Sequence, residues 1–349
     1  MRAISNPTIS TIYVSAALFG AVLAIGTVTP SASHAQSAAD FYKGKQINLL
    51  IGVGAGGEYD LQARLSGRYI GKHIPGNPIV VPQNMTGAGG LKMVNYLYNV
   101  APKDGTTLGM IPNNFPMMQA VGAHGVKFDA TKMQWIGSIA PTVETMAVWH
   151  TVGVTSIAQA REKEIIVGAS GRGAITFTFP TAMNEFLGTK FKIVTGYQGG
   201  NAINVAMERG EVQARDNTWS SWKVTKPDWL RDKKINVIAY AGPKPKDLPG
   251  VPSLSELAKS DDDRKILDLI NSGTEFGRPL ATTDKVPADR VKALRDAFNA
   301  TMHDKEFLAE AAKLNIEVDP VSGEYMQDLA AKLMATPKNL AARAKAIVE

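Results

Sequence analysis

The sequence of 349 residues contains no cysteine. This absence excludes thiol nucleophiles, thiolate zinc sites and iron–sulfur clusters. The histidines after residue 35 are also far apart, and none belongs to an H-x-x-x-H pair of the kind that binds zinc on one helix face. They are His73, His124, His150 and His303. The sequence therefore predicts neither a metal site nor any other cofactor.

The chain has no block of like charge. Its 38 basic and 32 acidic side chains are scattered and leave a net charge of +6. A nucleic-acid-binding protein would gather its basic residues on one patch, so no nucleic acid is expected as a partner. A mildly positive field suits anionic ligands instead. The hydrophobic fraction of 44% is typical of a chain with large folded cores.

The N-terminus has the pattern of a secretory signal peptide. Arg2 is the only charge in residues 1–35, and a short apolar run, 16–26, precedes the small residues Ser33 and Ala35. A bilayer span needs about 20 apolar residues, whereas this run is shorter and ends in a polar stretch. We therefore expect cleavage before Gln36, rather than an uncleaved anchor, and export of residues 36–349. That length suits two domains.

The remaining sequence repeats one pattern. The short apolar run at residues 46–53 predicts a buried strand, a glycine loop follows at 54–57, and 59–72 has helical spacing. The same order of strand, glycine loop and helix returns at 79–98, 164–187 and 191–209. This order predicts two α/β units with largely parallel sheets, and the rest of the chain reads as mostly helical.

The glycine loops are the clearest candidate for a binding site. At a strand-to-helix turn, glycine lets the backbone approach a ligand, and the helix N-terminus favours negative charge. Gly52, Gly54 and Gly57 also match the dinucleotide-binding pattern G-x-G-x-x-G. The acid that should follow the second strand is missing, because Gln83 and Asn84 stand there. We favour an anion site over a dinucleotide site, with tight turns as the alternative.

Three further features leave alternatives open. Ser170 lies outside any G-x-S-x-G nucleophile motif, so catalysis has little support. Arg172, at a loop tip, could grip a carboxylate bidentately or face water. The aromatic cluster of Trp219, Trp222 and Trp229 could wall a ligand cleft, although core packing is the favoured interpretation.

Several of these segments together resemble the substrate-binding receptors of tripartite tricarboxylate transporters, the Bug family. The resemblance covers nearly all of residues 36–349. It is carried by FYKGK at 41–45, GGEYD at 56–60, PQNMTGAGG at 82–90, APKDGT at 101–106, GASGRG at 168–173, YQGG at 197–200 and GEV at 210–212. Any one motif is modest, whereas their order and spacing are specific.

The resemblance implies a two-lobed α/β fold like that of type II periplasmic binding proteins, with two crossings between lobes. We expect the crossings near Pro112 and Val237. Lobe 1 would then comprise residues 36–112 and 238–349, and lobe 2 residues 113–237. A small carboxylate would lie between the lobes, held largely by backbone groups. Di- and tricarboxylates, aromatic acids and acidic amino acids are the candidates.

Carried over residue by residue, the resemblance places ligand contacts on both lobes. The predicted contacts are Gly56, Gly57, Asp60, Thr86, Gly87, Ala88 and Gly89 on the first lobe, and Ser170, Gly171, Arg172, Gly173, Gly200 and Asn201 on the second. Ala174 and Gln213 depart from the family's usual Ser and Asp, which leaves the identity of the ligand open.

The implied role is a monomeric periplasmic receptor without catalysis that delivers its ligand to membrane permease subunits. Two alternatives stay open. The same hinge would serve a receptor that reports to a membrane sensor kinase. A secreted hydrolase or lyase on this fold, with Ser170 as its nucleophile, is the less favoured one.

Overall fold

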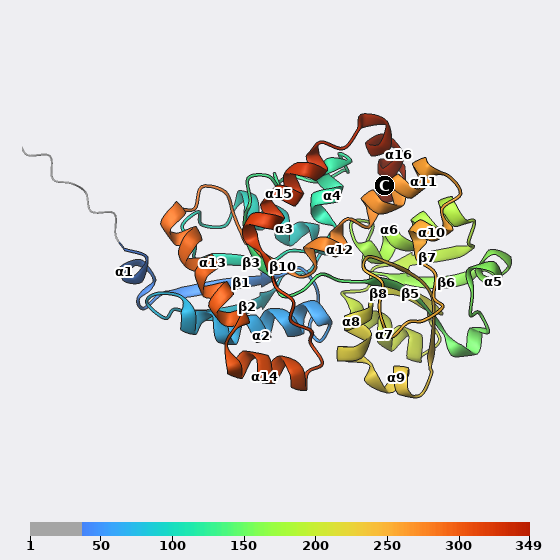
Figure 1. Cartoon of the computed structure of the whole chain (residues 1–349), viewed down its shortest axis with the longest axis horizontal. Coiled ribbons are helices and arrows are strands. Elements are labelled where there is room, and N and C mark those ends of the chain that lie inside the picture. The colour runs from blue at the N-terminus through green and yellow to red at the C-terminus, as the bar shows by residue number, and fades with distance from the viewer. Residues whose placement is uncertain (1–36) are drawn as a thin grey trace, which may run out of the picture. The chain divides into compact units, whose positions relative to one another are not determined.

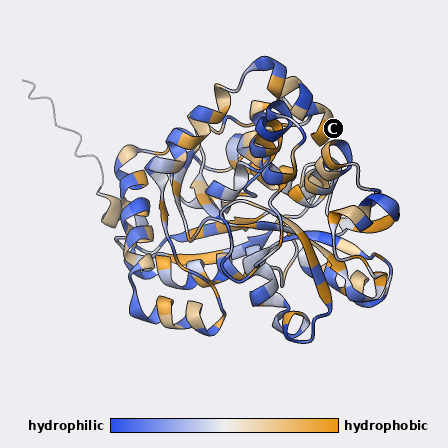
Figure 2. Ribbon diagram, turned by 45° about the vertical axis from the view of Figure 1, so that its right-hand side comes forward, coloured by the Kyte–Doolittle hydropathy of each residue, from blue (hydrophilic) through white to orange (hydrophobic). Residues whose placement is uncertain are grey.

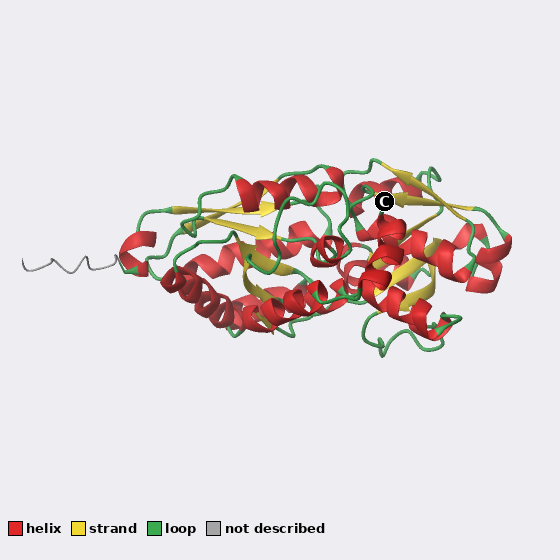
Figure 3. Cartoon of the chain, turned by 90° about the horizontal axis from the view of Figure 1, so that it is seen from above, coloured by secondary structure: helices red, strands yellow, loops and turns green. Residues whose placement is uncertain are grey.

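The computed structural model describes residues 37–349, and the predicted signal peptide lies outside them. Two mixed β-sheets, each flanked by helices, organise these residues (Figures 1 and 3). Among them no helix combines the length and the apolar character needed to cross a membrane.

The first sheet has the strand order β11-β4-β10-β3-β1-β2. Strands β1, β2 and β3 are parallel, and β10 runs antiparallel between β3 and β4. The strands are β1 Gln46–Ile51, β2 Ile79–Asn84, β3 Thr107–Met110, β4 Gln134–Ser138, β10 Pro279–Thr282 and β11 Val321–Ser322. Helices of this part are α1 Ala38–Tyr42, α2 Glu58–His73, α3 Leu91–Asn99, α4 Phe115–Ala120, α12 Gly273–Phe276, α13 Ala288–Met302, α14 Lys305–Lys313 and α15 Gly323–Met334.

The second sheet has the order β7-β6-β8-β5-β9, with β5 antiparallel to both its neighbours. Its strands are β5 Glu144–Trp149, β6 Ile165–Ala169, β7 Phe191–Thr195, β8 Ala214–Thr218 and β9 Ile235–Ala241. Its helices are α5 Ile157–Glu162, α6 Ile175–Ala182 with a π-helical continuation Met183–Leu187, α7 Gly200–Glu208, α8 Trp219–Thr225, α9 Pro227–Arg231, α10 Leu254–Leu257, α11 Asp261–Ile270 and α16 Lys338–Val348.

Both sheets share one topology. From one edge, the first sheet reads β2, β1, β3 and the second reads β7, β6, β8, so three parallel strands stand in the order second, first, third along the chain. The next strand in each sheet, β10 or β5, is antiparallel and follows the point where the chain crosses from the other sheet. The predicted α/β fold with two lobes is confirmed, and the strands pass between the two sheets twice. The antiparallel strands β5 and β10 went unrecognised in the sequence, because pairing partners far along the chain decide their sheet.

The crossings do not coincide with the predicted positions near Pro112 and Val237. Strand β4, at residues 134–138, still belongs to the first sheet, and Val237 lies inside β9 of the second. The strands change sheets between β4 and β5 and again after α11, and the chain passes to the second lobe once more between α15 and α16, because α16 packs against α6 and α11. We therefore place the two crossings between the sheets near residues 140 and 272 and a third crossing before α16. A short apolar strand such as β4 carries no sign of which sheet it will join.

Burial follows amphipathic patterning. In α2, Ala63, Leu65 and Ile70 are buried against the first sheet while Arg68 on the opposite face is exposed. Complete burial of a leucine or isoleucine side chain contributes about 1.5–3 kcal/mol. Figure 2 shows this alternation of hydrophobic and hydrophilic residues along the helices. The helices are thereby fixed on their sheets, and the loops at the strand ends are held in place.

Candidate functional site

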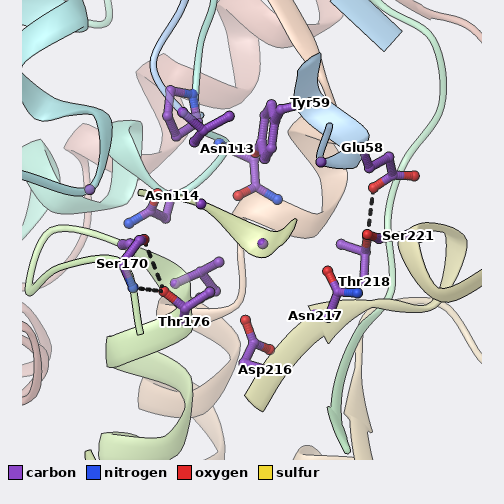
Figure 4. Close-up of a pocket in the computed structure, with 18 of the residues that line it drawn as sticks. Glu58, Tyr59, Asn113, Asn114, Ser170, Thr176, Asp216, Asn217, Thr218 and Ser221 are labelled. Carbon is purple, nitrogen blue, oxygen red and sulfur yellow. Dashed lines mark hydrogen bonds between the residues drawn. The ribbon is translucent and has the colours of Figure 1, made fainter. Parts of the chain in front are cut away.

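A cavity lies between the two lobes, at the ends of the parallel strands. The space in and around it that no protein atom fills is about 630 Å³, which includes the part that opens to solvent. Figure 4 shows polar side chains from both lobes converging on it. The lining residues include Val53, Gly57, Glu58, Tyr59, Gly89, Asn113, Asn114, Glu144, Ser170, Thr176, Gly200, Arg215, Asp216, Asn217, Thr218, Ser221 and Arg278.

Glycine loops bring the two lobes into direct contact beside this cavity. The Gly54 N–H donates to the Gln198 carbonyl across the lobes at 2.8 Å. Gly89 has a left-handed φ of +67°, and a Cβ there would lie 2.9 Å from Ala174 of the other lobe. A side chain at this position would push the loops apart, so the close approach requires glycine.

Three helices direct their N-termini at the cavity without any side-chain cap. The N-cap residues are Gly57 for α2, Ala174 for α6 and Gly199 for α7, and all three line the cavity. The first N–H groups of a helix have no partner within the helix, and the helix dipole places partial positive charge there. Helices from both lobes therefore offer an anion a set of converging donors.

Asp60 supports the first of these loops from behind. Its carboxylate accepts from the Gly56 N–H at 3.0 Å, from Arg64 Nε at 3.0 Å and from Asn84 Nδ2 at 2.9 Å. Burial opposes ionisation, but these hydrogen bonds outweigh it and lower the pKa of Asp60. Asp60 therefore positions the loop and does not line the cavity.

Five charged residues are buried around the cavity, each no more than 3% exposed as a whole residue: Glu58, Glu144, Arg215, Asp216 and Arg278. Arg278 forms an ion pair with Glu58, donates to Thr218 Oγ1 at 2.8 Å, and stacks 4.0 Å from the ring centroid of Tyr59. Burial alone would lower the pKa of Arg278. The nearby Glu58, Tyr59 and Glu144 raise it by more than burial lowers it, so the net shift is upward. Arg278 is a permanent cation.

Arg215 fixes the start of α7. Its Nη1 donates to the Gly200 carbonyl at 2.6 Å and to Asn204 Oδ1 at 2.8 Å, while Nη2 donates to Asn217 Oδ1 at 2.8 Å and Nε to the Asp216 carbonyl at 3.0 Å. These bonds use four of the five guanidinium N–H groups. Burial lowers the pKa of Arg215 to about 10, so it stays charged at neutral pH.

The two remaining acids hold protons more tightly than usual. Burial, together with Glu58, raises the pKa of Glu144, although Arg278 and a hydrogen bond from Asn113 oppose the shift. Burial and Glu144 raise the pKa of Asp216 well above its usual range, against the opposing effect of Arg215 and Arg278. The cavity thus carries titratable groups whose charge a ligand can change.

Most of the predicted site residues fall into three groups. Gly57, Gly89, Ser170 and Gly200 line the cavity itself. Thr86, Gly87 and Ala88 line an adjoining hollow together with Gly89 and Ser170. Gly56 and Gly171 lie at points of close approach between the lobes, against Asn201 and Gly89 respectively. A role of these residues in ligand binding stays a prediction.

Arg172 and Gly173 lie elsewhere. They line a separate hollow with His124 and Glu349, where Arg172 donates to the Glu349 carbonyl and packs 5.5 Å from the Phe177 ring. Arg172 is therefore exposed and outside the lining of the cavity, and it contacts Glu349 and Phe177 rather than water alone.

The tryptophans lie outside the cavity lining. Trp222 and Trp229 are buried in a core cluster beneath the second sheet, so core packing was the right interpretation for them. Trp219 packs against the same cluster and donates to Asp247. Ser221, between Trp219 and Trp222, does line the cavity.

Sequence reasoning missed the charged lining. Arg215, Asp216 and Asn217 are consecutive polar residues inside a fully buried strand. A polar triplet after the apolar Val212 and before a tryptophan-rich helix is the signal that could have marked them, since buried charges need a purpose. Glu58 lies in the GGEYD motif but was not among the predicted contacts, and Arg278 gave no local signal.

Comparison with known proteins supports the resemblance. No family model matches the chain. A UPF0065 protein from Cupriavidus necator is 24% identical over an alignment of 333 residues that covers 91% of this chain and 93% of that protein. The solved periplasmic binding protein BugD is 18% identical with a TM-score of 0.69, over 87% of this chain and 98% of its own.

A Rhodopseudomonas palustris protein, Rpa4515, solved with adipate, is 19% identical with a TM-score of 0.66, over 86% of this chain and 97% of that one. At these identities the solved structures establish the fold. The chain has the two-lobed fold of the Bug-type periplasmic binding proteins, and the resemblance to this family drawn from its motifs is confirmed.

Proposed function

We propose that this protein is a periplasmic solute-binding receptor that encloses a small carboxylate between its lobes and delivers it to the permease subunits of a tripartite tricarboxylate-type transporter. The observation that carries the proposal is the convergence of three uncapped helix N-termini, from α2, α6 and α7, on one interlobe cavity. Their N–H groups and dipoles are suited to a carboxylate.

The interlobe contacts explain how binding would be coupled to closure. The hydrogen bond from Gly54 to Gln198 and a second from Thr86 Oγ1 to Gln198 Oε1 at 3.2 Å link the lobes. A carboxylate bridging α2 and α7 would add contacts that exist only when the lobes are together, and so would favour the closed form. A permease could then distinguish loaded from empty receptor by its shape.

The relatives point the same way. Rpa4515 was solved with adipate, a dicarboxylate, and BugD is a periplasmic binding protein. Catalysis finds no support in the cavity, because the Ser170 hydroxyl lies 3.2 Å from another hydroxyl, that of Thr176, and the residues that line the cavity include no histidine. We therefore favour capture without chemistry.

A thermal-shift screen tests the proposal. The probes are di- and tricarboxylates, aromatic acids and acidic amino acids. A ligand that binds only the folded protein, at a concentration of 100 times its Kd, stabilises the folded state by about 2.7 kcal/mol. That stabilisation raises the melting temperature measurably. Failure of every probe to raise it would contradict the carboxylate assignment.

A matched pair of variants shows whether binding occurs in the cavity. Gly57 is buried and lines it, whereas Ala55 of the same loop is exposed and does not. Gly57→Val should abolish the shift by filling the space, and Ala55→Val should preserve it. Equal responses of the two variants would place the ligand elsewhere.

A further inference from the structure

One buried carboxylate in the cavity has no partner among residues 37–349. Asp216 is 0% exposed, and neither of its side-chain oxygens accepts a hydrogen bond from this part of the chain. Figure 4 shows its carboxylate pointing into the middle of the cavity. Buried polar groups are nearly always hydrogen-bonded, because leaving water without a replacement partner is costly. The partner of Asp216 is therefore expected to come from outside the chain.

The other unpartnered atoms of the lining define what that ligand must offer. Asn114 Oδ1 is a further acceptor without a partner, and Asn217 Nδ2 and Arg278 Nε are donors without one. The acceptors call for N–H or O–H groups on the ligand. The donors, together with the helix N-termini, call for an anionic group. A molecule with both a cation and a carboxylate satisfies both sets.

The charge of the lining agrees. Arg278 and Glu58 cancel as an ion pair, which leaves one cation, Arg215, facing the two acids Glu144 and Asp216. With every group ionised, the five buried side chains sum to −1. A simple dicarboxylate would add negative charge beside Asp216, whereas an ammonium group would neutralise it.

We propose that Asp216 receives an ammonium group of the ligand, so that the captured solute is an amino-substituted carboxylate rather than a simple di- or tricarboxylate. The inference rests on the proposed function, because the glycine loops and helix N-termini still hold the carboxylate. Asp216 determines specificity within the class of carboxylates, and nothing in the glycine-loop motifs encodes it.

Proton linkage distinguishes the two ligand classes. The groups facing Asp216 are Glu144 from β5, Arg215 from β8, Arg278 before β10, and Glu58 and Tyr59 from α2. In the empty cavity burial and Glu144 raise the pKa of Asp216, against the opposing effect of Arg215 and Arg278, so its protonated form is favoured more than it is in water. A bound ammonium favours the ionised form and displaces a proton, so its affinity rises with pH. A carboxylate would bind best to protonated Asp216, and its affinity would fall with pH.

Titration calorimetry with ligand pairs that differ only by the amino group tests the inference. The pairs are aspartate with succinate and glutamate with glutarate, at pH 6 and pH 8. In the wild-type protein we expect the better amino acid to bind at least about tenfold more tightly than its partner, with affinity higher at pH 8 and proton release to the buffer.

Two variants complete the test. Asp216→Asn should remove the preference for the amino acid, while Asp284→Asn, outside the cavity, should keep it; Asp284 is already paired with Lys103. The wild-type pH dependence stands as the second measurement if Asp216→Asn fails to fold.

Equal or tighter binding of succinate or glutarate overturns the inference and leaves the proposed function intact. Tighter binding of malate than aspartate overturns it in favour of a hydroxyl ligand. No binding by any probe overturns both.

Discussion

The ion pair between Arg278 and Glu58 offers a sharp test of how the site is built. Both side chains are almost fully buried, at 4% and 2% exposure. Replacing Arg278 by Met keeps much of its volume but removes the charge. Glu58 retains neutral donors from Gln62 at 3.1 Å and Thr218 at 2.7 Å, but no cation is left to pair with it.

The expected cost follows from that geometry. Removing one partner of a buried pair leaves an uncompensated charge and destabilises by about 3–5 kcal/mol. The double variant Glu58→Gln/Arg278→Met carries no charge at this site, and replacing a whole buried pair is often neutral. The two changes should therefore be non-additive, with the double variant more stable than Arg278→Met by about 2 kcal/mol or more.

Urea unfolding, followed by circular dichroism, measures both variants against the wild-type protein. Arg231→Met serves as the control, because Arg231 pairs with Asp232 at the surface and its loss should have no measurable effect. A loss below about 1 kcal/mol for Arg278→Met, or strict additivity in the double variant, would refute the reasoning that this pair is desolvated.

Three other outcomes follow from the loops. Asp60→Asn should destabilise the protein by about 1–3 kcal/mol in urea unfolding, because Asp60 holds the Gly56 loop. Since the pKa of Asp60 is lowered, its stabilising contribution should be full above the unfolded pKa near 3.9 and disappear as pH falls through the lowered folded value. Gly277→Ala should lower the melting temperature clearly more than Gly188→Ala. Both glycines have a positive φ, but a Cβ at Gly277 would collide with a carbonyl, whereas a Cβ at Gly188 would meet open space. Gly89→Ala should weaken carboxylate binding about tenfold or more in calorimetry, because its Cβ would hold the lobes apart.

The repeated units were predictable from sequence because their signals are local. A short apolar run before a glycine loop marks β1, β6 and β7, and their observed bounds lie close to the predicted ones. The strands that escaped prediction, such as β4 and β5, pair with partners far along the chain. Their sheet membership is a tertiary property, and the crossings between lobes were misplaced for the same reason.

The candidate site divides in the same way. Backbone positions such as Gly57, Gly89 and Gly200 could be predicted to lie at the cavity, because the family resemblance points to them and each lies in a glycine loop between a strand and a helix. The charged lining could not. Asp216 and Arg278 are 62 residues apart in the sequence, and only folding brings them to one cavity. Specificity therefore lies in the residues that local patterns describe least.

A crystal structure of the protein with its best-binding carboxylate tests the central claim most directly. We predict ligand density in the interlobe cavity, with a carboxylate against the N-termini of α2 and α7 near Gly57 and Gly200. Density for the ligand outside this cavity, or a bound ligand that contacts one lobe alone, would contradict capture between the lobes.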